Sequence, residues 1–418
     1  MVIGVGLMVW MIALGDGIHE IMIRSSLNTG LGSIQIHADG YNEDHAVEKA
    51  LVDPNEILAI AENTPGAEGV SIRLNAFGLL SRGNASQGTA IIGVDPVREL
   101  GISIIDEKLV DGEWLPPVYK RDGQYATVTQ GPDGEQVEYL ESNRLLPIVI
   151  GSGMARKLDV EVGDRVFCTM QGFTRDVGYA AYSVHGIFTT GMSELDKTVV
   201  YVPIDLLRDV MAADMDRYSN AAHEVTILLE SEVDEFSTAD YLKNELANAG
   251  ITDIEVMTWQ QIQPGLKQFI DLDAMGIYIF MVILFIIVAA GIMNTFLMGV
   301  YERIREFGVL MSIGMRPGAI FRMVMIESAI VGFIGGFFGL IAGLIATWIN
   351  TIYPFNYSAY SDIGEIFAFD WSLDLTPHLI FSNVLTAVIG IIITTLLAAL
   401  WPAIKAALLK PVEALRHI

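Results

Sequence analysis

The apolar residues of this 418-residue chain are gathered into four runs, and this distribution limits the fold more than any other feature of the sequence. The hydrocarbon core of a bilayer is about 30 Å thick, so a helix needs about 20 predominantly apolar residues to cross it. The runs are 2–14, 274–300, 323–349 and 379–404. The last three meet that length, and the first is short at its amino end. We predict four transmembrane helices.

The first run raises the question of a secretory signal. Such a signal needs basic residues ahead of its apolar core and a small-residue cleavage site. Neither is visible in Met1–Ile23, which we interpret as a retained first membrane helix with a very short or missing cytoplasmic leader. The alternatives are a cleaved segment or a start that differs from the native one.

The distribution of charge orients these helices. The net charge is −25, and residues 24–270 hold 18 of the 25 basic and 38 of the 50 acidic residues. Basic residues close to membrane ends in short loops mark the cytoplasmic side. The other seven are Arg303, Arg305, Arg316, Arg322, Lys405, Lys410 and Arg416. We therefore place residues 301–322 and both chain ends in the cytoplasm and residues 24–268 outside. So acidic a domain predicts no nucleic-acid partner.

The outer segment has the patterns of an α+β domain. Period-two alternation or β-branched enrichment predicts its strands, and helical spacing after Asp53-Pro54 predicts a helix. A strand–helix–strand order occurs at both ends of the segment, which suggests two related halves around a β-rich insertion. Residues 111–144 are rich in Gly, Pro and charge, and we expect a loop or irregular hairpin. The lone Cys168 allows no intrachain disulfide and is expected to be a buried, inert thiol.

Two segments connect this domain to the membrane. Thr258–Asp273 carries a helical apolar stripe into the second membrane helix, and the first helix continues past Leu14 through Gly15-Asp16-Gly17. We expect both to be helical stalks; flexible linkers are the alternative.

The third membrane helix carries overlapping small-residue motifs. Three Gly-x-x-x-Gly pairs predict a close helix–helix contact, because small residues let helices approach each other in lipid. The glycines are Gly332, Gly335, Gly336, Gly339 and Gly343. Glu327 is the exception to otherwise apolar spans, and it is either a functional intramembrane carboxylate or, as we favour, an interfacial packing residue.

Searches for catalytic motifs find little. The sequence has no G-x-x-x-x-G-K-[ST] phosphate loop and no H-E-x-x-H, and its seven histidines lack metal-ligand spacing. Gly151-Ser152-Gly153 resembles a nucleophile elbow only superficially, because G-x-S-x-G is absent. We therefore predict a non-enzyme with no catalytic, metal or cofactor site of its own.

The gap between the second and third membrane helices has more order than a connecting loop requires. Charged residues cost about 2.5–3.5 kcal/mol each at the bilayer centre, so this segment leaves the membrane. Ile304, Phe307 and Met311 follow helical spacing opposite the charged residues. Gly314 can end that helix and Pro317 can begin the next. We predict a short amphipathic helix with one face for the membrane surface and one for a partner.

Motifs along the chain resemble one permease family. EFGVLMSIGMRPGAIFRMVMIESAIVGFIGGFFG and the closing WPAIKAALLKPVEALRHI resemble the FtsX/MacB/LolC-LolE superfamily of ABC-transporter permeases. IIGVDP, IGSGMARKLDVEVGDRV and VHGIFTTGMSELDKTVVYVP are similar to the outer domain of lipoprotein-releasing permeases of the LolC/LolE type.

The resemblance implies a coupling helix that docks on a separate ABC ATPase dimer, which would hold ATP and Mg. The implied docking residues are Glu302, Arg303, Arg305, Glu306, Phe307, Gly308 and Met311. It also implies a second permease subunit, either another copy or a paralogue, in the bacterial inner membrane. The expected function is ATP-driven extraction of lipoprotein or another amphiphile, with a periplasmic carrier. The alternative is an FtsX-like scaffold that transmits motion to a periplasmic effector without transport; an intramembrane enzyme is a third reading.

The predicted fold class is therefore a membrane α-helical protein of four transmembrane helices, with a large extracytoplasmic α+β domain inserted between helices 1 and 2. The divisions are the first helix with its stalk (1–23), the outer domain (24–257), the second stalk and helix (258–300), the coupling helix (301–315), the third helix (316–349), an outer loop (350–378), the fourth helix (379–404) and a cytoplasmic tail (405–418).

Overall fold

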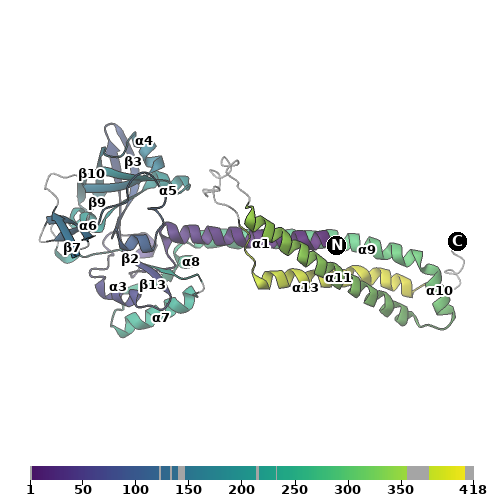
Figure 1. Ribbon diagram of the computed structural model, residues 1–418. Helices are drawn as coiled ribbons and strands as arrows, with labels where there is room; N and C mark the ends of the chain where they lie inside the picture. The colour runs from purple at the N-terminus through teal and green to yellow at the C-terminus, as the bar shows by residue number, and fades with distance from the viewer. Residues whose placement is uncertain are drawn as a thin grey trace. The chain divides into compact units, whose positions relative to one another are not determined.

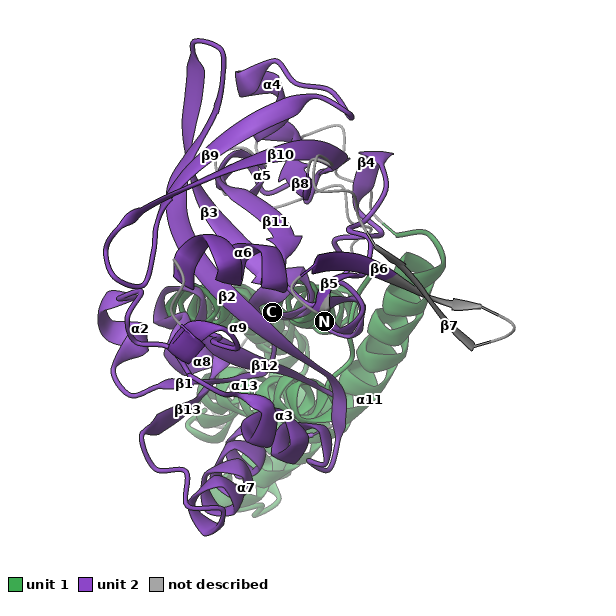
Figure 2. Ribbon diagram, turned by 90° about the vertical axis from the view of Figure 1, so that its left-hand side faces the viewer, with its two compact units in different colours: residues 1–22, 268–356, 374–418 green, residues 23–267, 357–373 purple. Residues whose placement is uncertain are grey.

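A computed structural model describes residues 2–121, 124–131, 134–139, 146–212, 216–231, 233–354 and 376–409. The chain divides into two compact units, coloured separately in Figure 2. The first comprises residues 1–22, 268–356 and 374–418, and the second comprises residues 23–267 and 357–373.

The first unit is helical. Its long helices are α1 (Val2–Ser26), α9 (Pro264–Glu302), α11 (Pro317–Ile352) and α13 (Phe381–Ala407), with the short α10 (Ile304–Ser312) between α9 and α11 (Figure 1). All four long helices have the length and apolar composition to cross a membrane. This confirms the predicted helical class. Only 11% of the most apolar window of α9 is buried within the chain, so this helix turns nearly all its apolar side chains outward.

The second unit is built on one mixed sheet. Its strand order is β13-β1-β12-β2-β3-β11-β8-β10-β4, and β9 pairs with both β10 and β2. The bounds are β1 (Ile34–Ala38), β2 (Ala67–Arg82), β3 (Ala85–Val94), β4 (Leu109–Gly112), β8 (Leu146–Gly151), β9 (Arg165–Gln171), β10 (Val177–Phe188), β11 (Val199–Pro203), β12 (Glu224–Leu229) and β13 (Ile254–Thr258). The large domain is therefore α+β, as predicted.

Short helices cover this sheet and join its strands. They are η1 (Leu27–Leu31), α2 (Tyr41–Asp44), α3 (Asn55–Glu62), η2 (Arg98–Gly101), α4 (Ser152–Leu158), α5 (Ser193–Thr198), α6 (Ile204–Ala212), η3 (Asp216–Tyr218), α7 (Glu235–Asn248) and α8 (Trp259–Ile262). The core beneath them includes Ile34, Ile36, Val225, Ile227 and Leu242, none more than 1% exposed. Their alternation along β1 and β12 gives each strand one inward face.

The strand–helix–strand units at the two ends of the domain do not form separate halves. The order β13-β1-β12-β2 interleaves β1–α3–β2 with β12–α7–β13, and all three pairings are antiparallel. The two helices α3 and α7 contact each other. This is the split β-α-β arrangement, with β3 to β11 inserted between its halves. As a consequence, β1 and β13, which adjoin the two membrane helices, are neighbouring strands.

Residues 111–144 were predicted to form a loop or irregular hairpin; the loop alternative is wrong for much of the segment, and the hairpin alternative is extended to three strands. Strands β5 (Val118–Arg121), β6 (Gln124–Gly131) and β7 (Gly134–Tyr139) form a three-stranded antiparallel sheet. Val118, Tyr119, Thr127 and Val128 supply β propensity, and Gly131 and Gly134 are paired at the ends of β6 and β7. Residues 122–123, 132–133 and 140–145 lie outside the described part.

Other predictions from the sequence can be compared directly with the structure. Cys168 is buried in β9, and burial raises the pKa of its thiol to about 12, consistent with an unreactive group. Helices α11 and α13 end at Ile352 and Ala407. Most of the predicted outer loop (355–375) and the last part of the tail (410–418) lie outside the described residues.

Candidate functional site

The break between α9 and α10 falls at Arg303, which has non-helical backbone angles. Helix α10 ends before Gly314, whose φ of +106° suits glycine. Pro317 then occupies the first turn of α11. The chain therefore turns twice within 15 residues because each boundary carries a residue that favours it.

The inward face of α10 is apolar. Ile304, Phe307 and Gly308 are buried, and Phe307 is only 1% exposed. Phe307 belongs to a cluster with Val300, Ile320, Val324, Ala403 and Ala406, against which Met311 packs in part. The predicted docking set therefore divides in two. Phe307 and Gly308 pack within the helical unit, and the docking role of the set stays a prediction.

The outward face of α10 is charged. Glu302, Arg305 and Glu306 are exposed, and Val309 and Ile313 expose apolar area beside them. Within the described part of this turn, these side chains form an exposed surface that carries both positive and negative charges. Such a surface fits a protein partner better than an anionic lipid face, because it alternates in sign.

Arg303 fixes the position of α10. Its Nε donates to Glu306 Oε2 at 3.0 Å, and one terminal nitrogen lies 2.9 and 3.2 Å from the two carboxylate oxygens of Glu327. The guanidinium also lies 5.3 Å from the centre of the Phe307 ring. Glu327 is therefore an ion-pair partner between α11 and the turn, in agreement with its interpretation as a packing residue. Arg303 takes part in this internal network, and its docking role stays a prediction.

A second cation lies beside the same turn. Lys405 Nζ contacts the Tyr301 hydroxyl and lies 4.7 Å from the Tyr301 ring and 5.1 Å from the Trp401 ring. Sequence reasoning assigned Lys405 only to the cytoplasmic tail. The pairing links the end of α9 to the end of α13, and no local pattern indicated it because 104 residues separate the partners.

The glycines of α11 face two different helices. A methyl group added at Gly332 would lie 2.8 Å from Thr395 Cγ2 of α13, and one at Gly336 would lie 3.6 Å from Ile391 Cγ2. Gly339 and Gly343 instead face α1, where such a group would lie 2.5 Å from Val5 Cβ and 2.7 Å from Val9 Cβ. Gly335 is buried as well. The small residues permit close packing on both sides.

Two polar pairs in the helical unit escaped the sequence analysis. Asn383 donates to both oxygens of Asp16 at 2.8 and 2.9 Å, and His19 Nε2 lies 2.7 Å from Asp273 Oδ2. The pairs join α1 to α13 and α1 to α9. Asp16 was visible only as an interruption in an apolar run, and its partner is 367 residues away.

The roots of the two long helices, residues 27–33 after α1 and 258–263 before α9, are in contact within the outer unit. Helix α1 continues into η1, where Asn28 O accepts from Ile104 N at 2.9 Å and Leu31 O accepts from the Gln35 amide at 2.6 Å. Strand β13 leads through α8 to α9, and Trp259 N donates to Ser33 O at 3.0 Å. Ile34 pairs with Thr258. The predicted stalks are therefore helical, and they arise from adjacent strands.

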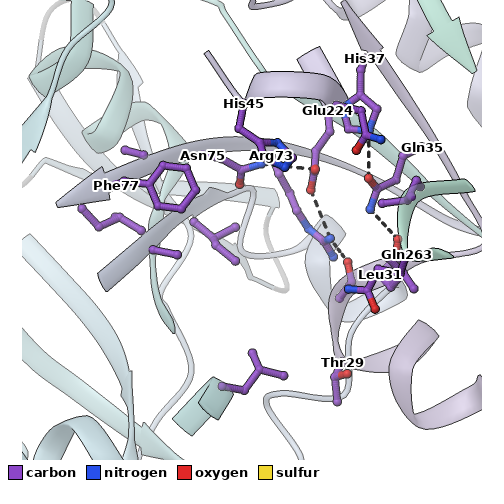
Figure 3. Close-up of a pocket in the computed structure, with 18 of the residues that line it drawn as sticks. Thr29, Leu31, Gln35, His37, His45, Arg73, Asn75, Phe77, Glu224 and Gln263 are labelled. Atoms are coloured by element: carbon purple, nitrogen blue, oxygen red, sulfur yellow. Dashed lines mark hydrogen bonds and ion pairs between the residues drawn. The ribbon is translucent and has the colours of Figure 1, made fainter. Parts of the chain in front are cut away.

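Arg73 is the centre of a buried polar network at this root. Its guanidinium binds Glu99 at 2.5 and 3.1 Å and donates to the carbonyl of Gly30 in η1. Arg73 is 3% exposed and Glu99 is fully buried. A buried charge is tolerated when it is paired and hydrogen-bonded, as here. Figure 3 shows Arg73 between Glu224 and the η1 segment.

No group of three or more His, Cys, Asp or Glu side chains suited to a metal ion occurs among the described residues. The geometry instead provides a turn of mixed charge held by an internal ion-pair network, and two long helices rooted on neighbouring strands. Such parts can dock a partner and transmit movement.

Comparison with known proteins identifies the class. Residues 1–245 match the MacB-like periplasmic core domain, and residues 278–411 match the FtsX-like permease C-terminal domain. The chain belongs to this family of FtsX-like ABC-transporter permeases that carry a MacB-like periplasmic core.

Its relatives are distant. The chain is 22% identical over 437 residues to the lipoprotein-releasing system transmembrane protein LolC of Xylella fastidiosa, covering 99% of this chain and 91% of that protein. It is 25% identical over 345 residues to the macrolide export ATP-binding/permease protein MacB 2 of Aeromonas hydrophila, covering 80% and 47%. The crystal structure of the periplasmic region of MacB from Actinobacillus actinomycetemcomitans matches with a TM-score of 0.35 at 12% identity, covering 59% of this chain and 95% of that one.

Proposed function

We propose that this chain is the permease subunit of a complex in which a separate ATPase drives movement of the outer domain. The observation that carries the proposal is the α10 turn. Its outward charged face is free for a partner, while its inward face and Arg303 join it to α11 and α13. Movement imposed on α10 would therefore pass directly to membrane helices.

We propose further that the complex extracts a lipoprotein or another amphiphile from the inner membrane. Similarity to LolC proteins along 99% of the chain supports this choice. The long α1 and α9, rooted on paired strands, support transmission to the outer domain. A second permease subunit, a second copy or a paralogue, would complete the complex, with ATP and Mg on the ATPase.

The docking face is tested by charge reversal at Glu306. The Glu306→Lys variant should abolish ATP hydrolysis that depends on the permease, because Glu306 is exposed on the outward face. The matched control is Glu161→Lys, an exposed carboxylate in the outer domain. ATPase activity of the reconstituted complex is measured together with thermal unfolding. Normal stimulation in a well-folded Glu306→Lys complex would contradict the assignment of α10.

Transport is tested by crosslinking the purified complex to acylated cargo. We expect crosslinks that disappear after ATP is added. If no acylated cargo copurifies in any nucleotide state while ATP hydrolysis remains stimulated, extraction is wrong and transmission to a periplasmic effector is the function to pursue.

A further inference from the structure

The outer unit contains a cavity of about 370 Å³ beside the root of α1, shown in Figure 3. One part of its wall is apolar, and the other is polar and comes from β1, β2 and β12. The apolar lining residues include Phe77, Ala90, Ile92, Met192, Leu195 and Ile262. The polar ones include Gln35, His37, Arg73, Asn75 and Glu224. A cavity with apolar walls and a few converging polar groups is the usual form of a small-molecule site.

The carboxylates on the polar side are not balanced by the buried cation. Arg73 contacts both Glu99 and Glu224, and its contacts with Glu99 are shorter. Glu99 has two short contacts with the guanidinium, whereas Glu224 Oε1 lies 3.4 Å from it. Among the described residues, Glu224 Oε2 accepts a long bond, 3.3 Å, from the Asn75 amide. Two carboxylates therefore share one guanidinium, and the less well paired of the two lines the cavity.

The neighbouring histidines make different contacts, and both ring nitrogens of His37 face oxygen atoms, Gln35 Oε1 at 2.9 Å and His223 O at 3.2 Å. His223 Nδ1 accepts from Asn75 N–H at 3.0 Å, and its Nε2 faces the Val47 carbonyl at 2.9 Å, an arrangement that a neutral imidazole satisfies. Burial lowers the pKa of both His37 and His223. The cluster of Arg73, Glu99 and Glu224 places two carboxylates on one guanidinium beside an apolar wall, and Glu224 is 8% exposed.

We infer that this cavity binds an amphiphilic amine, with its ammonium group on Glu224 and its apolar part against Phe77 and Ile92. An ammonium would donate hydrogen bonds to a carboxylate whose other contacts are 3.3 and 3.4 Å long, and charge-assisted bonds are about twice as strong as neutral ones. An anion would be repelled by Glu224, and the guanidinium of Arg73 is already bound to Glu99 and Gly30. A neutral alcohol would gain no charge pairing. The site involves neither α10 nor an ATPase.

Three probes with alkyl groups of equal length distinguish an amine, an alcohol and an anion as ligands of the unmodified protein. Hexylammonium, hexan-1-ol and hexanoate are titrated by calorimetry into the full chain in nanodiscs of zwitterionic lipid, and the heat from empty nanodiscs is subtracted. We expect saturable binding of hexylammonium that is at least about tenfold tighter than that of hexanol, the factor that corresponds to one good charge-assisted bond. Hexanoate should bind more weakly still.

Variants locate the site. Glu224→Gln removes the charge but keeps an oxygen that can accept from Arg73, so it should fold and should bind hexylammonium no better than hexanol. Glu161→Gln, an exposed control, should bind like the unmodified chain. Phe77→Ala should weaken hexylammonium and hexanol alike, at little cost in stability because Phe77 is 55% exposed.

Three results would overturn the inference: no saturable amine binding, equal affinity for the three probes, or unchanged amine affinity in Glu224→Gln. None of them depends on the ATPase partner.

Discussion

Arg303 and Glu327, 24 residues apart, are joined by two contacts of 2.9 and 3.2 Å, and the same guanidinium binds Glu306 in the next turn of chain. One cation therefore ties α10 to α11. Because two carboxylates share it, either one can hold the guanidinium when the other is removed.

This sharing predicts non-additive effects on stability. Glu306→Gln and Glu327→Gln should each change the free energy of unfolding by less than about 1 kcal/mol, since the partners are partly exposed. The double variant should lose more than the sum of the two, because Arg303 then has neither carboxylate. Thermal unfolding of the four chains in nanodiscs measures this. Strict additivity would mean that the two contacts act independently.

Close packing of α1 on α11 predicts a steric effect at Gly339. Gly339→Ala places a methyl group 2.5 Å from Val5 Cβ, so the helices must separate, at a cost of about 1–3 kcal/mol. Gly276→Ala on α9 is the matched control, because nothing lies within 4 Å of the added group. Thermal unfolding in nanodiscs compares the two. Equal stability of both variants would count against the α1–α11 contact.

The buried network predicts that replacing Arg73 alone lowers the stability of the outer domain more than replacing both Arg73 and Glu99. Arg73→Met leaves Glu99 buried without its cation and should destabilise the outer domain by about 3–5 kcal/mol. Arg73→Met combined with Glu99→Leu should recover a large part of that loss. Denaturant unfolding followed by Trp fluorescence gives both values. A double variant as unstable as Arg73→Met would show that the loss comes from other contacts of Arg73.

The two buried histidines predict a pH dependence. Burial lowers the pKa of His37 and His223 in the folded state, so the unfolded chain binds more protons below its own His pKa of about 6.5. The free energy of unfolding should therefore fall as pH decreases from about 6.5 toward the folded pKa, by up to about 1.4 kcal/mol per pH unit for each imidazole. His223→Gln should flatten the slope.

An unmodified chain whose stability does not vary between pH 7 and 5 would contradict the lowered pKa of the two buried imidazoles.

Much of the secondary structure could be predicted because its causes are local. The apolar runs predicted four helices, and the sequence patterns predicted a strand–helix–strand order at both ends of the outer domain, as observed for β1–α3–β2 and β12–α7–β13. In the segment 111–144 the three-stranded sheet could not be predicted, because β5, β6 and β7 become apparent only through their pairing with one another. The amphipathic spacing of α10 could be predicted in advance, but the residues of α11 and α13 that cover Phe307 could not, because they are distant in sequence.

The sequence by itself determined which segments are long and apolar enough to cross a membrane, and where Gly314 and Pro317 turn the chain, because length, composition and backbone preference belong to consecutive residues. Only the tertiary structure decided that Arg73 meets Glu99, Glu224 and Gly30, and that Asp16 meets Asn383. These partners are separated by 26 to 367 residues, and their interaction follows from how strands and helices pack, not from any local pattern.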